Sequence, residues 1–302
     1  MEKEILCLIL MTTYNGEKYL KDQIDSILAQ TYTGWNLLIQ DDDSNDNTYD
    51  ILTEYGKKDS RIHIFRNEYS LGATLNFEKL MLRSKADYIM FCDQDDVWLE
   101  DKVEVTIDEL INLELKRGKN TPIVVYTDQQ IVDESLHNIE NIARHYNSTL
   151  FGILCQNHVY GCTMAINKIL KENVLPFPKY VVGHDYWLAL NAAALGEVHF
   201  IDYKSMLYRQ HSGNVTGGMN NYSLWNKLNK WRRTNDNIKK TIYQNYNFCK
   251  SIYMNNDAQK YIEIVETPRI LRPVRALKNG FSTDRSLALL RILYVFIIYD
   301  RK

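Results

Sequence analysis

Short apolar runs alternate with stretches of helical hydrophobic spacing through the first half of the chain. Residues 5–11 form a continuous apolar run, which is typical of a strand buried on both faces of a sheet. Apolar side chains then recur three and four positions apart over residues 20–28, which predicts a helix, and Asn15 is a candidate cap for it. The alternation continues, with strands predicted at residues 35–39, 62–65, 88–92 and 123–126 and helices at residues 51–55, 75–82 and 103–111. This pattern predicts an α/β fold with a mostly parallel central sheet flanked by helices.

The second half of the chain is less regular. The spacing predicts a strand at residues 159–166, a helix at residues 186–195 and one or two strands at residues 198–208. From residue 222 onward the pattern is helical, and Pro268 and Pro273 interrupt it before a last amphipathic segment at residues 287–298. We therefore expect one α/β domain over residues 1–216 and a helical C-terminal extension over residues 217–302.

The composition is that of a globular protein. The chain has 302 residues, of which 45% are hydrophobic and 25% charged, and no apolar stretch approaches the length of a membrane span. Its first residues include no cationic leader, so we expect a cytoplasmic location. The five cysteines lie far apart without a Cys-x-x-Cys pair, which favours buried, reduced thiols.

The charge is unevenly distributed. Residues 267–302 contain eight Lys or Arg and two Asp or Glu, a net charge of +6, which leaves −8 on residues 1–266. A basic, apolar tail suits peripheral contact with the inner face of a membrane. A solvated helical face, or pairing with a second copy of the chain, is the alternative.

Two acidic clusters follow predicted strands. Asp41, Asp42 and Asp43 come after the second strand, and Asp93, Asp95 and Asp96 come after the fourth; in open α/β sheets, ligands bind at this edge. Crowded carboxylates repel one another unless a cation or hydrogen-bond donors neutralise them. Each cluster could also be a turn, but the second lies between apolar segments, which favours a functional role.

The second cluster has the chemistry of a divalent-cation site. An Asp-x-Asp pair supplies hard oxygen ligands of the kind that Mg²⁺ and Mn²⁺ prefer, whereas a thiolate or imidazole cluster of the zinc type is absent from the sequence. A cation held there would stabilise a diphosphate leaving group. The sequence has no Gly-x-x-x-x-Gly-Lys-Ser/Thr loop, and no Gly-x-Gly-x-x-Gly follows the first strand. P-loop NTPases and Rossmann dehydrogenases are therefore disfavoured.

Several ordered motifs resemble the signatures of glycosyltransferase family 2, which has the GT-A fold. They are Thr-Thr-Tyr-Asn from residue 12, Gln-Asp-Asp-Asp-Ser-Asn-Asp-Asn-Thr from residue 40 and Asp-Gln-Asp-Asp-Val-Trp from residue 93. Leu-Gly at residue 71, Asn-Phe-Glu at residue 76, Gly-His-Asp-Tyr-Trp at residue 183 and Tyr-Arg-Gln-His at residue 208 look like its bacterial rhamnosyltransferase-like branch. The resemblance covers about residues 5–216. One departure is Asp43, where the family more often has Gly.

The resemblance implies a Rossmann-like nucleotide-sugar-binding half over residues 1–115 and an acceptor-binding half over residues 116–216. It places Thr12, Tyr14 and Asp42 in the nucleotide pocket, where Asp42 would accept from the pyrimidine N3–H, with Asp41 as second choice.

The same resemblance assigns the metal–diphosphate motif to Asp93 and Asp95, with Asp95 the preferred direct ligand. It makes Asp96 a neighbour of the sugar hydroxyls. Downstream, His211 could complete the metal shell and Arg209 could contact the diphosphate, although both residues are as well explained by structural roles.

Asp185 is the general base that the resemblance implies. An inverting transfer needs a carboxylate near the acceptor hydroxyl, although an Asp before Tyr-Trp-Leu could also cap a helix. His184 is placed at the acceptor, and Trp187 either stacks on an acceptor sugar or belongs to the core. For Lys102 we expect a role at the surface.

The sequence thus predicts a metal-dependent, inverting glycosyltransferase. The branch resemblance suggests dTDP-β-L-rhamnose as donor, and a UDP-sugar is the alternative. The implied acceptor is a growing bacterial surface polysaccharide on a lipid carrier, and we expect no nucleic acid partner. A nucleotidyltransferase and a non-catalytic glycan-binding module are the competing classes, but the first strand leads to Thr-Thr-Tyr-Asn instead of a basic Gly-rich loop.

Overall fold

The computed structural model describes residues 7–140, 147–211, 213, 224–252, 254–283 and 286–299. The chain forms two compact units. The first contains Met1–Ile142, Val159–Phe177 and Gly183–Gly218, and the second contains Ala143–His158, Pro178–Val182 and Met219–Lys302. In the described part of the chain, no helix combines the length and the apolar character needed to cross a membrane.

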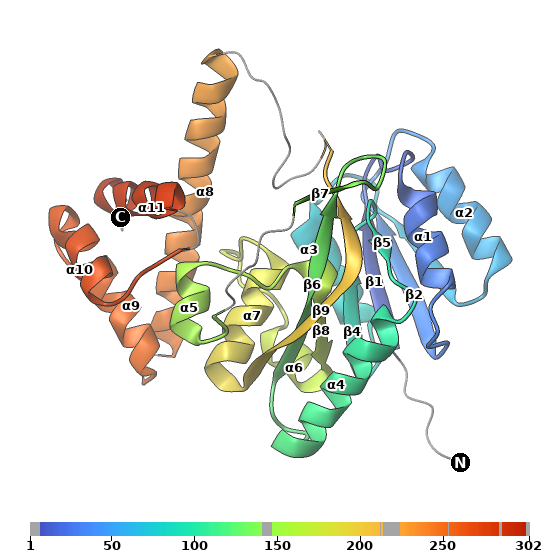
Figure 1. The fold of residues 1–302 in the computed structure, drawn as a ribbon, viewed down its shortest axis with the longest axis horizontal. Helices are drawn as coiled ribbons and strands as arrows, with labels where there is room; N and C mark the ends of the chain where they lie inside the picture. The colour runs from blue at the N-terminus through green and yellow to red at the C-terminus, as the bar shows by residue number, and fades with distance from the viewer. Residues whose placement is uncertain are drawn as a thin grey trace. The chain divides into compact units, whose positions relative to one another are not determined.

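The first unit is built on one mixed sheet (Figure 1). Its strands are β1 (Cys7–Thr13), β2 (Trp35–Asp41), β3 (Ile62–Arg66), β4 (Tyr88–Cys92), β5 (Val97–Trp98), β6 (Ile123–Val132), β7 (Asn138–Glu140), β8 (Met164–Asn167) and β9 (Glu197–Arg209). Their order is β3-β2-β1-β4-β8-β6-β9-β5, and β7 pairs with β6. The pairs β1–β2, β1–β4, β2–β3 and β6–β9 are parallel, whereas β8 is antiparallel to β4 and β6. The carboxyl ends of β1, β2 and β4 therefore meet at one edge.

Helices cover this sheet and bury apolar side chains against it. They are α1 (Leu20–Leu28), α2 (Thr48–Lys58), α3 (Ala73–Arg83), α4 (Lys102–Arg117), α6 (Lys168–Val174) and α7 (His184–Leu195). In α1, for example, Leu20, Ile24 and Ile27 are fully buried against a core that includes Ile9 and Met11 of β1. Spacings of three and four residues bring these side chains onto one side of the helix.

The second unit is helical in its described part. It contains α5 (Leu150–Cys155), α8 (Leu224–Ser251), α9 (Asn256–Glu266), α10 (Arg272–Lys278), α11 (Ser286–Ile298) and a 3-10 turn, η2 (Arg269–Leu271). The Phe296 ring of α11 packs edge-on against Phe281, with 5.5 Å between ring centroids. Arg272 is buried and donates to the carbonyl oxygens of Phe296 and Tyr299, which ties α10 to α11.

The structure confirms most of the predicted elements, including the strands at residues 35–39, 62–65 and 88–92. The predicted strand at residues 159–166 is wrong in its first part, because a 3-10 turn, η1 (Gly161–Thr163), precedes the short strand β8. Asn15 does not cap α1, which begins at Leu20; its side-chain oxygen accepts from the Asn45 backbone N–H instead. All five cysteines are buried, free thiols, as their apolar surroundings predict.

Candidate active site

The loop after β2 begins with a buried carboxylate that organises its own turn. Asp41 has no exposed surface and accepts from the Thr13 hydroxyl at 3.0 Å and from the Ser44 hydroxyl at 2.6 Å. The Ser44 backbone N–H also donates to it, at 3.1 Å. Arg66 of β3 lies 3.5 Å from Asp41 and donates to the Ser44 carbonyl oxygen. These contacts give Asp41 a structural role at the ends of β1 and β2.

Asp42 fastens the segment before α3 to the end of β2. One oxygen accepts from Asn67 Nδ2 at 2.8 Å and from the Leu71 N–H at 2.7 Å, and the other accepts from the Ser70 hydroxyl at 2.7 Å and the Gly72 N–H at 2.9 Å. Burial opposes ionisation, but hydrogen bonds outweigh it and lower the pKa of Asp42 to about 2. Each oxygen thus has two donors. The predicted contact with a pyrimidine N3–H requires one of the four to be replaced.

Backbone geometry explains the departure at Asp43. Asp43 has a φ of 63°, in the left-handed region, where glycine is favoured and aspartate and asparagine are tolerated. Asn15, on the facing loop, has a φ of 47°. The turn geometry of the family's glycine is therefore available to this sequence.

Gln94 joins the loop after β1 to the acidic loop after β4. The Tyr14 N–H donates to Gln94 Oε1 at 2.8 Å, and Gln94 Nε2 donates to the Tyr14 carbonyl oxygen at 3.0 Å. Gly16 makes room for this contact, because a Cβ atom at residue 16 would stand 2.3 Å from Gln94 Oε1. Tyr14 itself is half exposed and Thr12 is partly buried, so both remain candidates for the nucleotide pocket. Gln94 belongs to the Asp-Gln-Asp-Asp motif, but the sequence assigned it no role of its own, and no pattern marked Gly16.

The acidic loop brings several carboxylates close together. Burial, then repulsion from Asp95 and Asp185, raises the pKa of Asp93 to about 7. Burial and the same kind of repulsion, from Asp95 and Asp93, raise the pKa of Asp96 well above its usual range. Asp96 Oδ2 is buried and has no hydrogen-bond partner among the residues that the structure describes. A divalent cation would relieve this repulsion, so the donor set fits one.

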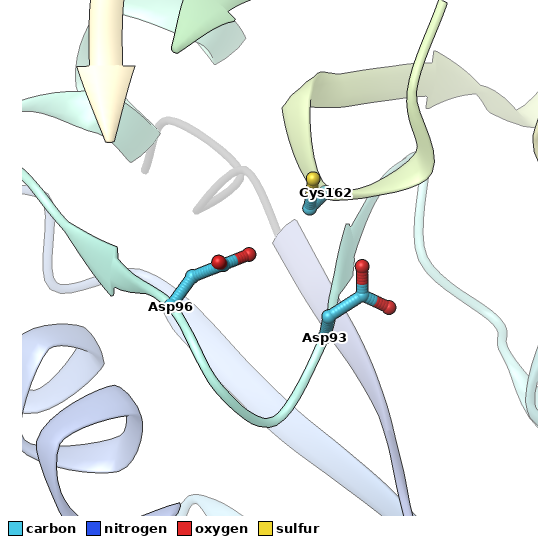
Figure 2. A group of neighbouring side chains, drawn as sticks. All are labelled: Asp93, Asp96 and Cys162. Carbon is cyan, nitrogen blue, oxygen red and sulfur yellow. The ribbon is translucent and has the colours of Figure 1, made fainter. Parts of the chain in front are cut away.

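Cys162 lies beside these carboxylates. Figure 2 shows Asp93 and Asp96 at the two ends of the loop after β4, with the Cys162 side chain of η1 near both. A ligand atom from each of the three residues lies within 4.8 Å of the others. Burial raises the pKa of Cys162 well above its usual range, so the thiol is protonated and a poor ligand beside hard carboxylate oxygens. In the sequence, only its apolar neighbours marked Cys162, as a buried thiol.

His211 is brought to the acidic loop by β9. Its Nε2 atom lies 2.9 Å from Asp95 Oδ2, and the side chains of both residues are partly buried. The Tyr19 ring packs against the imidazole with 4.7 Å between centroids. An imidazole and a carboxylate in this position could both coordinate one cation, which keeps the metal prediction for His211 and Asp95 open.

Arg209 is not placed to clamp a diphosphate. Its side chain is buried and its guanidinium donates to the carbonyl oxygens of Asp95 and Glu134 and to the Asp22 carboxylate. Its backbone N–H donates to Asp96 Oδ1 at 3.0 Å. These donors are directed into the protein, so the structural alternative for Arg209 is favoured. Asp96, with no exposed surface, is likewise an anchor of the loop and not a residue that meets sugar hydroxyls in this conformation.

Asp185 lies in the first turn of α7, about 90 residues along the chain from the acidic loop. Its side chain is partly exposed, and the Tyr186 backbone N–H donates to it at 2.7 Å. Its negative charge is one of the causes that raise the pKa of Asp93. Burial raises the pKa of Asp185 itself to about 6, against the backbone hydrogen bonds that lower it. A carboxylate with such a pKa can accept a proton at neutral pH.

The neighbours of Asp185 are core residues. His184 is buried, with its ring 3.9 Å from that of Phe77, and burial lowers its pKa to about 3, so the imidazole is neutral. Trp187 is 6% exposed. The acceptor contact predicted for His184 is therefore not favoured, and for Trp187 the core alternative is favoured.

The surface role predicted for Lys102 is wrong, because this lysine is fully buried. Its ammonium group donates to the Ser205 hydroxyl at 2.8 Å and lies 4.9 Å from the centre of the Trp98 ring. Burial lowers the pKa of Lys102 to about 8, and the nearby Asp96 opposes that change. Lys102 therefore contributes positive charge next to the acidic loop, and this charge favours the ionised form of Asp96.

Sequence comparison places this site among sugar-transferring enzymes. A family model described as Glycosyl transferase family 2 matches residues 8–116. The chain is 30% identical over 246 residues to the dTDP-rhamnosyl transferase RfbG of Shigella flexneri, covering 74% of this chain and 81% of that protein. It is 32% identical over 188 residues to an Escherichia coli protein, the UDP-Glc:alpha-D-GlcNAc-diphosphoundecaprenol beta-1,3-glucosyltransferase WfgD, covering 62% and 70% of the two chains.

Solved structures share the fold, which is of the GT-A type. Residues 1–349 of S. aureus TarS, in complex with UDP-GlcNAc, match with a TM-score of 0.60 at 14% identity, covering 97% of this chain and 90% of that chain. The mannosyltransferase PcManGT from Pyrobaculum calidifontis, in complex with GDP-Man and Mn²⁺, matches with a TM-score of 0.57 at 10% identity, covering 96% and 73%.

Proposed function

The chain belongs to glycosyl transferase family 2, and from this premise we propose that it is an inverting enzyme that transfers a sugar from a nucleoside diphosphate to an acceptor hydroxyl. The observation that carries the proposal is the pairing of Asp185 with the acidic loop. Asp185 comes from α7 and Asp93 from the end of β4, and Asp185 is close enough for its charge to raise the pKa of Asp93. An inverting transfer needs these two functions, a base for the acceptor and a site for the leaving diphosphate.

The proposed reaction is a single displacement. Asp185, as a carboxylate, takes the proton of the acceptor hydroxyl while the acceptor oxygen forms a bond to the anomeric carbon. The bond between that carbon and the diphosphate oxygen breaks, and the nucleoside diphosphate leaves with the electron pair. Partial burial of Asp185 raises its pKa to about 6, so at neutral pH most molecules have the basic form while its proton affinity remains useful.

We propose that Asp93, Asp95 and His211 hold the divalent cation, although the three ligand atoms that lie within 4.8 Å of one another among the described residues belong to Asp93, Asp96 and Cys162. Support comes from the repulsion that raises the pKa of Asp93 and from the short contact between Asp95 and His211. The Mn²⁺ in the PcManGT complex, on a similar fold, supports the use of a divalent cation. When bound, Mg²⁺ or Mn²⁺ would supply positive charge that stabilises the diphosphate leaving group. Through its two hydrogen bonds to the Tyr14 backbone, Gln94 would hold the acidic loop next to the proposed nucleotide-binding loop.

For the donor we propose dTDP-β-L-rhamnose, which would give an α-L-rhamnoside. The similarity to RfbG over 81% of that protein supports this choice. A UDP-sugar is the alternative, supported by the similarity to WfgD and by the UDP-GlcNAc complex of TarS. For the acceptor we propose a growing bacterial surface polysaccharide on a lipid carrier at the inner face of the membrane, since the name of WfgD describes a lipid-linked acceptor.

A donor panel tests the proposal. The full chain is incubated with dTDP-rhamnose, UDP-glucose, UDP-galactose and UDP-N-acetylglucosamine, with Mn²⁺ or with EDTA, and released nucleoside diphosphate is measured with and without lipid-linked acceptor. We expect one donor to dominate, with Mn²⁺ required. With inorganic pyrophosphate added, conversion of the donor to nucleoside triphosphate and sugar 1-phosphate would identify a nucleotidyltransferase. Donor binding without release would identify a non-catalytic module. Full turnover in EDTA would contradict the metal role.

A further inference from the structure

The second unit has an apolar stripe that faces solvent along η2 and α10. Ile270, Leu271, Val274 and Leu277 are 78%, 53%, 51% and 51% exposed. Positions 270, 274 and 277 are four and three residues apart, the spacing that gathers side chains on one face of a helix. Large apolar side chains exposed singly are ordinary, but four together on one short segment indicate a binding surface.

A second stripe lies on α11, the helix that packs on α10. Leu290, Tyr294, Ile297 and Ile298 are 63%, 43%, 38% and 37% exposed, and they too follow helical spacing. The opposite side of the helix is anchored, because Leu293, Val295 and Phe296 are buried. The exposed stripe therefore belongs to a helix whose opposite side is packed in the core.

The charge around these stripes is positive. Basic residues recur every third position from Arg269 to Lys278, and the sequence has no Asp or Glu at residues 267–283 or 286–298. Arg269, Arg275 and Lys278 are exposed, whereas Arg272 is buried and binds carbonyl oxygens. Arg275 also pairs with Glu263 of α9. Long basic side chains beside exposed apolar ones can extend to lipid headgroups while their neighbours enter the acyl boundary.

We propose that the exposed faces of η2, α10 and α11 form a docking surface for an anionic bilayer. The 13 residues of α11 are too few to cross a bilayer, so the helix would lie along the surface. A protein partner would be expected to offer carboxylates, but an anionic membrane supplies negative charge and an apolar layer together. This role for the surface rests on the proposed function, because membrane binding would bring the enzyme to a lipid-linked acceptor.

Vesicle binding tests this surface without requiring turnover. The full chain is sedimented with vesicles of phosphatidylcholine and phosphatidylglycerol, and with phosphatidylcholine alone. We expect binding at least about tenfold tighter to the anionic vesicles, weakening as salt is raised. The variant Ile270→Ser/Leu277→Ser should lose about tenfold or more in affinity for anionic vesicles. Leu115→Ser, at a 75% exposed position on α4 of the first unit, is the matched control and should bind as the unchanged protein does.

The remaining outcomes are decisive as well. Equal weak binding to both vesicle types at low salt would overturn the proposal. So would a dimer, seen by light scattering, that the double variant converts to a monomer, because the stripe would then be covered by a second copy. Circular dichroism checks that the variants keep their helices. Donor turnover is measured separately, so failure of the proposed enzyme activity leaves the vesicle result interpretable, and failure of vesicle binding leaves the donor assay intact.

Discussion

Replacement of Asp42 by Asn tests whether a saturated carboxylate holds the segment before α3. The change preserves the size of the side chain but removes its charge. At present four donors from Asn67, Ser70, Leu71 and Gly72 converge on the two oxygens. In Asp42→Asn, one oxygen keeps its acceptor role, but the new amide group faces a backbone N–H that it cannot satisfy.

The expected cost follows from the pKa. A fall in the pKa of Asp42 from 3.8 to about 2 means that folding favours its charged form by roughly 2.4 kcal/mol. Because the folded pKa is lowered, this stability is fully present above about pH 5 and is lost as pH falls through the folded value near 2. By pH 3 about 1 kcal/mol of it should already be gone. We expect Asp42→Asn to lower the free energy of unfolding by roughly 2 to 3 kcal/mol at pH 7.

Urea denaturation of both proteins between pH 7 and pH 3 provides the measurement, followed by tryptophan fluorescence and circular dichroism. Asp43→Asn is the matched control, since Asp43 is partly exposed on the same loop, its ion pair with Arg66 is a long one of 3.8 Å, and Asn tolerates its φ of 63°. That variant should stay within about 0.5 kcal/mol of the unchanged protein.

Two results would refute the reasoning. Equal stability of Asp42→Asn and the unchanged protein at pH 7 would mean that the four hydrogen bonds add no net stabilisation. A stability difference that stays constant down to pH 3 would mean that it does not come from the charge of Asp42.

Further predictions concern the rest of the site. Asp185→Asn should lower kcat by about a thousandfold or more while donor KM changes little, and full activity would exclude Asp185 as base. In the unchanged enzyme, kcat should rise with pH as Asp185 loses its proton. Because a bound cation nearby favours the carboxylate and lowers its pKa, this rise should be centred at or below about pH 6. Gly16→Ala should weaken nucleotide and Mn²⁺ binding together, by roughly tenfold, because the new Cβ would displace Gln94. The double variant Gly16→Ala/Gln94→Ala should bind both ligands no more weakly than Gln94→Ala alone. Additive losses of affinity would contradict the contact between the two residues. His211→Ala should weaken Mn²⁺ binding, measured by electron paramagnetic resonance, by about tenfold or more, and unchanged binding would remove His211 from the metal site.

The order of the elements could be read from the sequence because each depends on local spacing. The continuous run before Thr13 and the run before Asp93 are buried in adjacent parallel strands, β1 and β4, as such runs predict. With the strands placed, the two acidic loops had to meet at one edge of the sheet. The helices predicted at residues 103–111 and 186–195 lie within α4 (Lys102–Arg117) and α7 (His184–Leu195).

The sequence could not decide which polar side chains are buried. Arg209, His184 and Lys102 carry groups that are common at active sites, yet the structure directs each into the protein. Their partners, such as Asp22 for Arg209 and Ser205 for Lys102, are distant in sequence and are brought near only by the packing of β9.

The sequence by itself determined the fold class, the family resemblance and the acidic loops, because all three depend on residue types in local order. Only the tertiary structure decided that Asp42 is saturated by four donors, that Gln94 joins the two loops across Gly16, and that Asp185 acts on Asp93. These properties depend on distances between segments that have no fixed separation along the chain. A carboxylate's pKa depends on what surrounds it, and its surroundings exist only after folding.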